Sequence, residues 1–280
     1  MTERKKICAE MRSRMAKKKK ILAKVIAQNM LTEGICDLWL ETPLAQDVRP
    51  GQFVGVYPAS ASELLPRPIS ICRVNKDKTA IRLVYRIVGK GTAEFALYQP
   101  GEYLSILGIL GNGFPMEQAA GKKVMLMGGG IGIPPLLELA AQLKGLPQEL
   151  SPKEILVVMG YRDAQTFLTE EFAQNGQLYI ATEDGSIGTK GNVLDAVREN
   201  ELKADVIYAC GPMPMLRAIK RYAQENGQDA YISLEERMAC GVGACLGCVC
   251  NTVQKDAHSH VNNTRICTDG PVFAAKDVDI

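Results

Sequence analysis

The sequence lacks any run of eighteen or more apolar residues, about the length that a membrane-spanning helix requires. It also lacks the apolar segment that follows the basic start of a secretory signal peptide. We therefore expect a cytoplasmic protein that does not enter a membrane, where thiols bind metals more often than they form disulfides. The 280 residues, 46% of them hydrophobic, are enough for a buried core and two domains.

Net charge is also small, at +2, but it is unevenly distributed. Residues 1–20 contain nine Lys or Arg and two Glu, so they carry a charge of +7 and the rest of the chain carries −5. Such a basic segment can contact nucleic acid or acidic lipid. A solvated arm is the simpler explanation, so we predict that residues 1–17 are a disordered extension and that the protein binds no nucleic acid.

After the basic segment, the sequence pattern changes twice, near residues 119 and 233. Residues 18–118 contain short segments rich in β-branched and aromatic residues, separated by Pro, Gly, Asn and Asp, which predict a small antiparallel β-barrel. Residues 119–232 alternate strand-like with helical segments, which predicts an α/β domain with a parallel sheet. Residues 233–280 are rich in glycine and cysteine and form a third, smaller unit. The predicted fold class is α+β, with several domains.

Five of the nine cysteines fall in the last 41 residues. Four of them have the spacing C-x4-C-x2-C-x18-C, which is typical of a plant-type [2Fe–2S] centre. The predicted ligands are Cys240, Cys245, Cys248 and Cys267. Glycines and an alanine lie between them, and small residues let a loop wrap around a cluster. The alternative, structural zinc, usually takes two C-x2-C pairs, and only one is present. Cys250 is interpreted as a packed thiol.

A glycine-rich stretch, "GGGIG", stands where a predicted strand meets a predicted helix. Such a turn offers free backbone N–H groups to a phosphate. The motif "CGP" ends the fourth strand of the same series, so both lie at the edge where parallel sheets bind ligands. The predicted nucleotide-binding residues are Gly128, Gly129, Gly130, Ile131, Gly132, Cys210, Gly211 and Pro212. A tight turn with a buried cysteine is the alternative for "CGP". Arg162 favours NADP and Asp163 favours NAD, which leaves the choice open.

The predicted barrel carries three further motifs, "RPIS" at 67–70, "VYR" at 84–86 and "GT" at 91–92. Arg67 can pair with a phosphate, Tyr85 can stack on a flat ring, and "GT" precedes a short helix whose start suits an anion. Considered alone, each motif is no stronger than a surface arginine or a barrel tyrosine.

The order of these motifs resembles that of the ferredoxin–NADP reductase superfamily, over about residues 18–280. The tail "ERMACGVGACLGCVC" followed by "CTDGPVF" resembles the electron transfer subunits of class B dihydroorotate dehydrogenases. The resemblance implies FAD in the barrel, NAD in the α/β domain and one [2Fe–2S] cluster on the four cysteines. The implied FAD-binding residues are Arg67, Pro68, Ile69, Ser70, Val84, Tyr85, Arg86, Gly91 and Thr92. One departure is Ile109, which stands where the family pattern leads us to expect proline.

The resemblance also implies a function. Electrons would pass between NAD and the FMN of a dihydroorotate dehydrogenase catalytic subunit, through FAD and the cluster, in pyrimidine biosynthesis. The implied assembly is a heterotetramer with two of each subunit. We expect no catalytic acid or base, because the cofactors carry the chemistry. The alternatives are an electron-transfer subunit of a hydrogenase, a sulfide dehydrogenase or an NADH-dependent ferredoxin–NADP reductase, and a zinc-stabilised module that binds nucleic acid.

Overall fold

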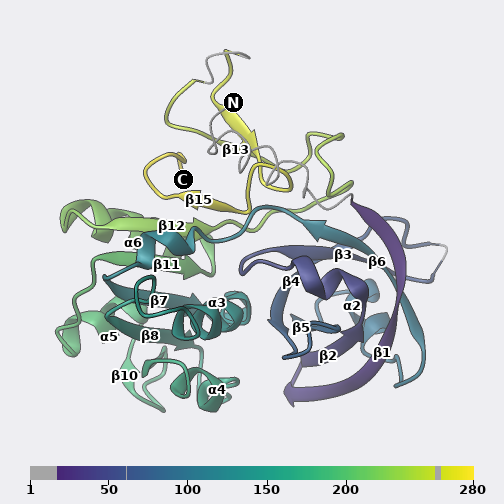
Figure 1. Ribbon diagram of the computed structural model, residues 1–280, viewed down its shortest axis with the longest axis horizontal. Coiled ribbons are helices and arrows are strands. Elements are labelled where there is room, and N and C mark those ends of the chain that lie inside the picture. Colours follow the sequence, from purple (N-terminus) through teal and green to yellow (C-terminus); the bar gives the residue numbers. More distant parts are fainter. Residues whose placement is uncertain (1–17, 61, 256–259) are drawn as a thin grey trace.

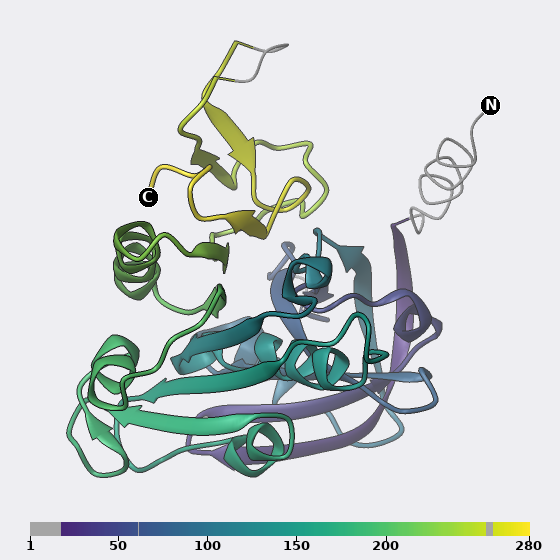
Figure 2. The same ribbon diagram turned by 60° about the vertical axis from the view of Figure 1, so that its left-hand side comes forward.

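The computed structural model describes residues 18–60, 62–255 and 260–280 (Figure 1). The predicted basic extension, residues 1–17, lies outside them. A barrel stands beside an α/β sheet, and the cysteine-rich region lies across one end of both (Figures 1 and 2). No helix within the described residues is long and apolar enough to cross a membrane.

The barrel closes in the order β1-β2-β5-β4-β3-β6, with every neighbouring pair antiparallel. Its strands are β1 (Lys19–Thr32), β2 (Ile35–Glu41), β3 (Phe53–Tyr57), β4 (Arg67–Val74), β5 (Ala80–Arg86) and β6 (Tyr103–Leu110). Side chains alternate between core and solvent, as the pleat requires: Ala23 and Val25 are buried, whereas Leu22 and Lys24 are exposed. The predicted antiparallel barrel is confirmed.

Three short helical segments complete the barrel region, namely η1 (Pro43–Asp47), α2 (Lys90–Phe95) and η2 (Met116–Ala119). The helix α2 follows β5 and is fixed at both ends. At its start, the Thr92 hydroxyl accepts from the backbone N–H of Val88 at 3.0 Å. At its end, Phe95 is 1% exposed and packs edge-to-face on Tyr85, with ring centroids 6.2 Å apart. The helix therefore holds the end of β5 in place.

The α/β domain is a seven-stranded sheet in the order β10-β9-β8-β7-β11-β12-β15. Its strands are β7 (Lys123–Gly129), β8 (Glu154–Tyr161), β9 (Gln177–Thr182), β10 (Thr189–Lys190), β11 (Val206–Cys210), β12 (Asp229–Ser233) and β15 (Val272–Ala274). Its helical segments are η3 (Gly130–Gly132), α3 (Pro135–Lys144), α4 (Thr169–Ala173), α5 (Val193–Glu199) and α6 (Met213–Glu225). All pairs are parallel except β12 with β15, so the predicted βαβ series is confirmed.

The two faces of the sheet have different neighbours. Met125 and Met127 of β7 share a core with α5 and α6. Val124 and Leu126, which point the other way, share a core with α3, α4 and three barrel side chains, Ile35, Cys72 and Val84. The barrel therefore packs against the α3–α4 side of the α/β domain, and two of its residues, Phe53 and Leu110, also join the core of the other face.

The cysteine-rich region, residues 234–271, leaves the sheet after β12 and returns to it as β15. The backbone N–H of Leu234 donates to the carbonyl of Pro271 at 2.9 Å, so the two ends of the region meet. Inside it, β13 (Val249–Asn251) and β14 (Asn263–Arg265) form a two-stranded antiparallel sheet. No periodicity in the sequence indicated that this region would be framed by two strands of one sheet.

Candidate functional site

A cavity of about 560 Å³ lies where the barrel, the α/β domain and the cysteine-rich region meet. This volume is within the range of small-molecule sites. All the predicted flavin residues except Gly91 line it. The barrel contributes Phe53, Arg67, Pro68, Ile69, Ser70, Val84, Tyr85, Arg86, Val88 and Thr92. The opposite wall consists of Ile131, Ser233, Leu234, Glu235, Glu236, Arg237, Met238 and Pro271.

The barrel strands explain why these motifs meet. The residues "RPIS" begin β4 and "VYR" ends β5, and these two strands run antiparallel as neighbours, so the beginning of one lies beside the end of the other. Tyr85 is 2% exposed and its hydroxyl accepts from Gln28 Nε2 at 3.3 Å. Burial raises the pKa of this phenol, which therefore stays protonated at neutral pH.

Arg67 supplies the cation that the sequence predicted for a phosphate. Its guanidinium forms an ion pair with Glu63 and donates to the carbonyl of Leu65 at 2.5 Å. It also lies against the start of α2, where a Cβ added to Gly91 would be 2.8 Å from Arg67 Nε. Gly91 therefore leaves room for the arginine, and a bound phosphate would have to share Arg67 with Glu63.

Sequence reasoning missed the far wall of this cavity. Residues 233–238, which we call the linker, run from the last residue of β12 toward the first predicted cluster ligand. The segment "EER" within the linker has the composition of an ordinary solvated loop. Pro271, four residues after Cys267, lies on the same wall. Both ends of the cysteine-rich region therefore border the cavity.

The two predicted nucleotide turns are brought together. They end the adjacent strands β7 and β11, where Cys210 is in register with Gly128. A Cβ on Gly132 would be 2.5 Å from the Gly211 backbone, so only glycine permits this approach. Cys210 is 1% exposed, and burial raises the pKa of its thiol. The backbone of these turns, rather than the Cys210 side chain, is thus the part available to a ligand.

The nucleotide turn and the flavin-type cavity adjoin each other, because Ile131 of the turn lines the cavity wall. Arg162 and Asp163 follow β8, the next strand of the sheet. The Asp163 carboxylate accepts the backbone N–H of Gln165 at 2.8 Å, and Arg162 is exposed.

Backbone N–H groups face two of the four predicted cluster ligands. Val242 donates to Cys240 Sγ and Gly247 donates to Cys245 Sγ, each at 3.4 Å. Such donors stabilise a thiolate, which is the form of cysteine that binds a metal. Cys248 precedes β13 and Cys267 follows β14, so the two-stranded sheet lies between the third and fourth predicted ligands. Among the described residues, no three His, Cys, Asp or Glu side chains are grouped to hold one metal ion.

The thiols have contrasting surroundings. Cys248 and Cys267 are almost fully buried, whereas Cys245 is exposed. Burial of Cys240 opposes ionisation, but hydrogen bonds led by the N–H of Val242 outweigh it and lower the pKa to about 6. Burial raises the pKa of Cys267 to about 11. Thiolate is the form that binds iron, and the lowered pKa of Cys240 favours that form at neutral pH.

Cys250, the fifth cysteine, lies on β13 opposite Thr264. It is half-buried and packs against the core of the α/β domain. Burial raises the pKa of its thiol to about 11. These surroundings are those of a packed thiol.

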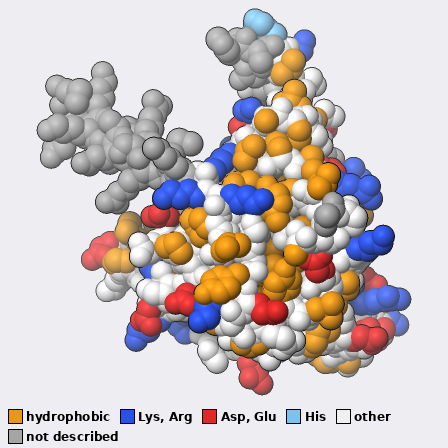
Figure 3. Space-filling view, turned by 90° about the vertical axis from the view of Figure 1, so that its right-hand side faces the viewer, with side chains coloured by type: hydrophobic (Ala, Val, Ile, Leu, Met, Phe, Trp, Pro, Cys, Tyr) orange, Lys and Arg blue, Asp and Glu red, His pale blue; other side chains and the backbone are white. Residues whose placement is uncertain are grey.

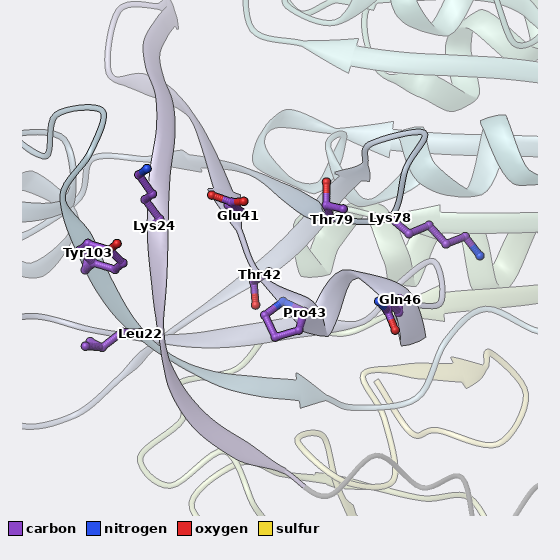
Figure 4. A pocket seen from close by; sticks show the side chains of 9 residues that line it. All are labelled: Leu22, Lys24, Glu41, Thr42, Pro43, Gln46, Lys78, Thr79 and Tyr103. Carbon is purple, nitrogen blue, oxygen red and sulfur yellow. The ribbon is translucent and has the colours of Figure 1, made fainter.

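A separate cavity of about 410 Å³ opens on the outer wall of the barrel (Figure 4). Lys24, Glu41 and Lys78 place charges of both signs around it, and Tyr103 covers one side. It contains none of the residues that the sequence analysis singled out.

Two family models match parts of the chain. The iron-sulfur cluster binding domain of dihydroorotate dehydrogenase B matches residues 235–279. The oxidoreductase NAD-binding domain matches residues 126–221. These segments contain the cysteine motif and the two nucleotide turns, respectively.

Relatives match over nearly the whole chain. The dihydroorotate dehydrogenase B (NAD(+)) electron transfer subunit of Bacillus caldolyticus is 46% identical over 260 residues, which are 91% of this chain and 96% of that protein. The subunit of the same name from Geobacillus kaustophilus is 45% identical with the same coverage.

Solved structures agree with the architecture. An NADH-dependent reduced ferredoxin–NADP oxidoreductase structure, studied for flavin-based electron bifurcation, superposes with a TM-score of 0.80 at 28% identity, covering 92% of this chain and 90% of that one. A ferredoxin NADP+ reductase from Neisseria gonorrhoeae with bound FAD and NADP has a TM-score of 0.62 at 14% identity, covering 78% and 94%, and shows the fold alone.

Proposed function

The chain belongs to the family of dihydroorotate dehydrogenase B electron transfer subunits, and from that premise we propose that it carries electrons between NAD and a partner subunit that oxidises dihydroorotate. It is an oxidoreductase component that uses FAD, one [2Fe–2S] cluster and NAD. When these groups are bound, the flavin links the two-electron chemistry of NAD to the one-electron chemistry of the cluster.

The observation that carries this proposal is the shared cavity. Its barrel side presents Arg67 and Ser70 to a flavin, and Ile131 connects it to the nucleotide turn. Its remaining wall is formed by the first residues of the cysteine-rich region, and Met238 of this wall lies two residues before Cys240. Electron transfer requires closely spaced centres, and the junction of the barrel, the nucleotide turn and the cysteine-rich region supports such an arrangement.

The residues have separate tasks in this proposal. The backbone of the two glycine-containing turns binds the NAD pyrophosphate, and the barrel motifs orient the flavin. The linker, residues 233–238, excludes water from the side of the cavity that faces the cysteines. Cys240, Cys245, Cys248 and Cys267 hold the cluster.

For the partner, we infer an FMN-containing dihydroorotate dehydrogenase catalytic subunit, in a complex with two of each chain, which serves pyrimidine biosynthesis. The stretch "ACGVGACLGCVC" has no charged residue, and interface cores are depleted in charge. Within it Leu246 is 62% exposed and Val242 37%. Hydrophobic side chains also run over the barrel face below this region (Figure 3). The cysteine-rich region is therefore our candidate contact surface.

Analysis of the purified chain tests the cofactors. We expect about two iron atoms and one FAD per chain, with visible absorption from both. Zinc in place of iron would contradict the cluster, and iron without flavin would contradict the role of the cavity.

Copurification tests the partner. An FMN-containing barrel protein is expected to accompany the tagged chain. The similarity to the NADH-dependent reduced ferredoxin–NADP oxidoreductase favours a second candidate, a subunit that serves ferredoxin rather than dihydroorotate. Recovery of a glutamate-synthase-like or hydrogenase subunit instead of an FMN protein would support that candidate.

A charge at Leu246 tests the contact surface. Leu246→Glu should keep the cluster spectrum, because this side chain points to solvent, and should weaken association with the partner in size-exclusion chromatography. Leu150→Glu is the matched control, since Leu150 is 54% exposed but belongs to the α/β domain. An intact complex with Leu246→Glu, or equal weakening by both variants, would contradict a contact at this place.

A further inference from the structure

A buried carboxylate, Glu138, joins the barrel to the α/β domain. It lies in the first turn of α3 and is 5% exposed. Its Oε2 accepts the backbone N–H of Val74, at the end of β4, at 2.9 Å and lies 3.5 Å from Arg73 Nη1. Its Oε1 accepts from Gln142 Nε2, on the next turn of α3, at 2.7 Å. Each oxygen therefore has a partner, one in the barrel and one in the helix.

The barrel leaves a place for this carboxylate. The pairing of β4 with β3 ends at Ser70, which is in register with Phe53. The last residues of β4 therefore lack a strand on that side, and a buried N–H without a partner is costly. Glu138 supplies the acceptor that the missing strand would have supplied for Val74.

The two elements that Glu138 connects are those that carry the binding motifs. The strand β4 begins with Arg67–Ser70, which line the flavin-type cavity. The helix α3 begins just after the glycine turn Gly130–Gly132, the predicted site of NAD. A shift of α3 relative to β4 would therefore move one binding element relative to the other.

A second charge cluster, buried on its barrel side, links the same two domains. Arg82 of β5 binds Asp37 of β2 with two hydrogen bonds, of 2.7 and 2.8 Å, and is 7% exposed. Its Nη1 donates to Glu171 Oε1 of α4 at 2.6 Å. Two contacts at separate places restrain both rotation and translation of the α/β domain relative to the barrel. A single contact does not restrain rotation.

We propose that Glu138 is a positioning residue for the reaction between NADH and FAD, with the Arg82–Glu171 pair as a second anchor. This inference rests on the proposed function, because it requires flavin and nicotinamide to meet at the junction of the two domains. Reacting atoms must lie about 3–3.5 Å apart, so a misplacement of about 1 Å can slow a reaction about 100-fold. The Glu138 carboxylate is buried, and its two hydrogen bonds, to Val74 and Gln142, are directional and so favour one position of α3 against β4.

The test uses the full chain loaded with FAD and iron. Glu138→Leu removes both acceptors at similar volume. In stopped-flow measurements, the rate of flavin reduction at saturating NADH should fall about 10- to 100-fold. Bound FAD and iron should stay unchanged, and the long-wavelength absorption of nicotinamide stacked on flavin should weaken. The matched control is Glu154→Leu, because Glu154 pairs with Lys123 on the surface of the same sheet.

Conservative variants separate positioning from folding. Glu138→Gln keeps an oxygen for the Val74 N–H and should recover most of the rate. Combining it with Glu171→Gln, which weakens the second anchor, should slow reduction more than either change alone. An unchanged rate and absorption band in Glu138→Leu, or equal slowing in Glu154→Leu, would overturn the proposal. If Glu138→Leu does not fold, an unchanged rate in the double Gln variant would overturn it. A wild-type chain without FAD would instead contradict the proposed function.

Discussion

The barrel and the cysteine-rich region differ in what holds their shape. The barrel is a closed ladder of six strands around fully buried side chains such as Leu38, Ile81 and Leu104. The cysteine-rich region has one two-stranded sheet with three residues in each strand, and two of its buried side chains are the predicted ligands Cys248 and Cys267.

The two regions therefore fold for different physical reasons. The barrel has an apolar core of its own, and burial of that core stabilises its fold. A region with so small a core usually needs a metal or disulfides to fold stably. We therefore expect the cysteines of the cysteine-rich region to support its fold as well as its function, whereas the barrel should depend less on its cofactor.

The largest expected effect is the loss of the cluster from the cysteine-rich region while the barrel keeps its FAD. Cys248→Ser should abolish the cluster, because it removes a buried ligand that also contacts the α/β core. Iron should fall to a small fraction of the wild-type content while FAD remains. Reduction of small dyes by NADH should persist, but transfer to the partner should be lost.

Cys36→Ser is the control, since Cys36 is a fully buried barrel cysteine that is not a predicted ligand. It should retain iron. Loss of FAD together with iron in Cys248→Ser would mean that the two regions are not independent.

A packing change in the barrel should weaken FAD binding and leave the iron content unchanged, which is the opposite of the result expected for Cys248→Ser. Phe95→Ala removes a buried ring that supports Tyr85 and should cost about 3–5 kcal/mol. FAD should dissociate at a lower temperature in a thermal melt followed by flavin fluorescence. Tyr103 lies on the outer face of the barrel and is 57% exposed, so Tyr103→Ala should leave that temperature nearly unchanged. Equal effects from both variants would contradict the assignment of stability to the core.

The smallest expected effect concerns Asp269, which accepts the backbone N–H of Arg265 at 3.0 Å. Burial opposes its ionisation, but this bond and the Arg265 guanidinium outweigh it and hold the pKa below the ordinary 3.8. The folded pKa is lowered, so the contact stabilises above pH 3.8 and is lost as pH falls through the folded value.

Asp269→Asn should therefore speed the loss of cluster absorption at neutral pH by an amount corresponding to about 1 kcal/mol or less, because the pair is partly exposed. Its difference from the wild type should become smaller as the pH falls toward the folded pKa of Asp269. Asp277→Asn, near the chain end, is the control. If the difference between Asp269→Asn and the wild type grows as the pH falls, the pKa of Asp269 is raised in the folded protein rather than lowered.

Much of this architecture could be predicted from the sequence, because its signals are local. The alternating burial in β1 depends only on the residues of that strand. The alternation of strands and helices after residue 119 likewise depends only on the composition of each segment. The cysteine spacing and the glycine turns are also local, so the sequence predicts these ligands and turns without knowledge of the fold.

Features that depend on distant pairing could not be predicted. Nothing around Glu138 indicates that β4 lacks a strand neighbour at Val74, because that gap arises from the length of β3. The linker, residues 233–238, has the composition of a surface loop, and it becomes a cavity wall only because β12 ends beside the barrel. β15 is three residues long, too short for any periodicity.

The return of the chain at β15 makes the cysteine-rich region an insertion rather than a tail. Its two ends, Leu234 and Pro271, are already hydrogen-bonded across neighbouring strands. A tight turn in place of residues 235–270 would turn β12 and β15 into an ordinary hairpin and leave the order of the sheet unchanged. In evolutionary terms, a metal-binding module can thus be gained or lost at one sheet edge by a single replacement that keeps the sheet and changes only the cavity wall formed by residues 235–238.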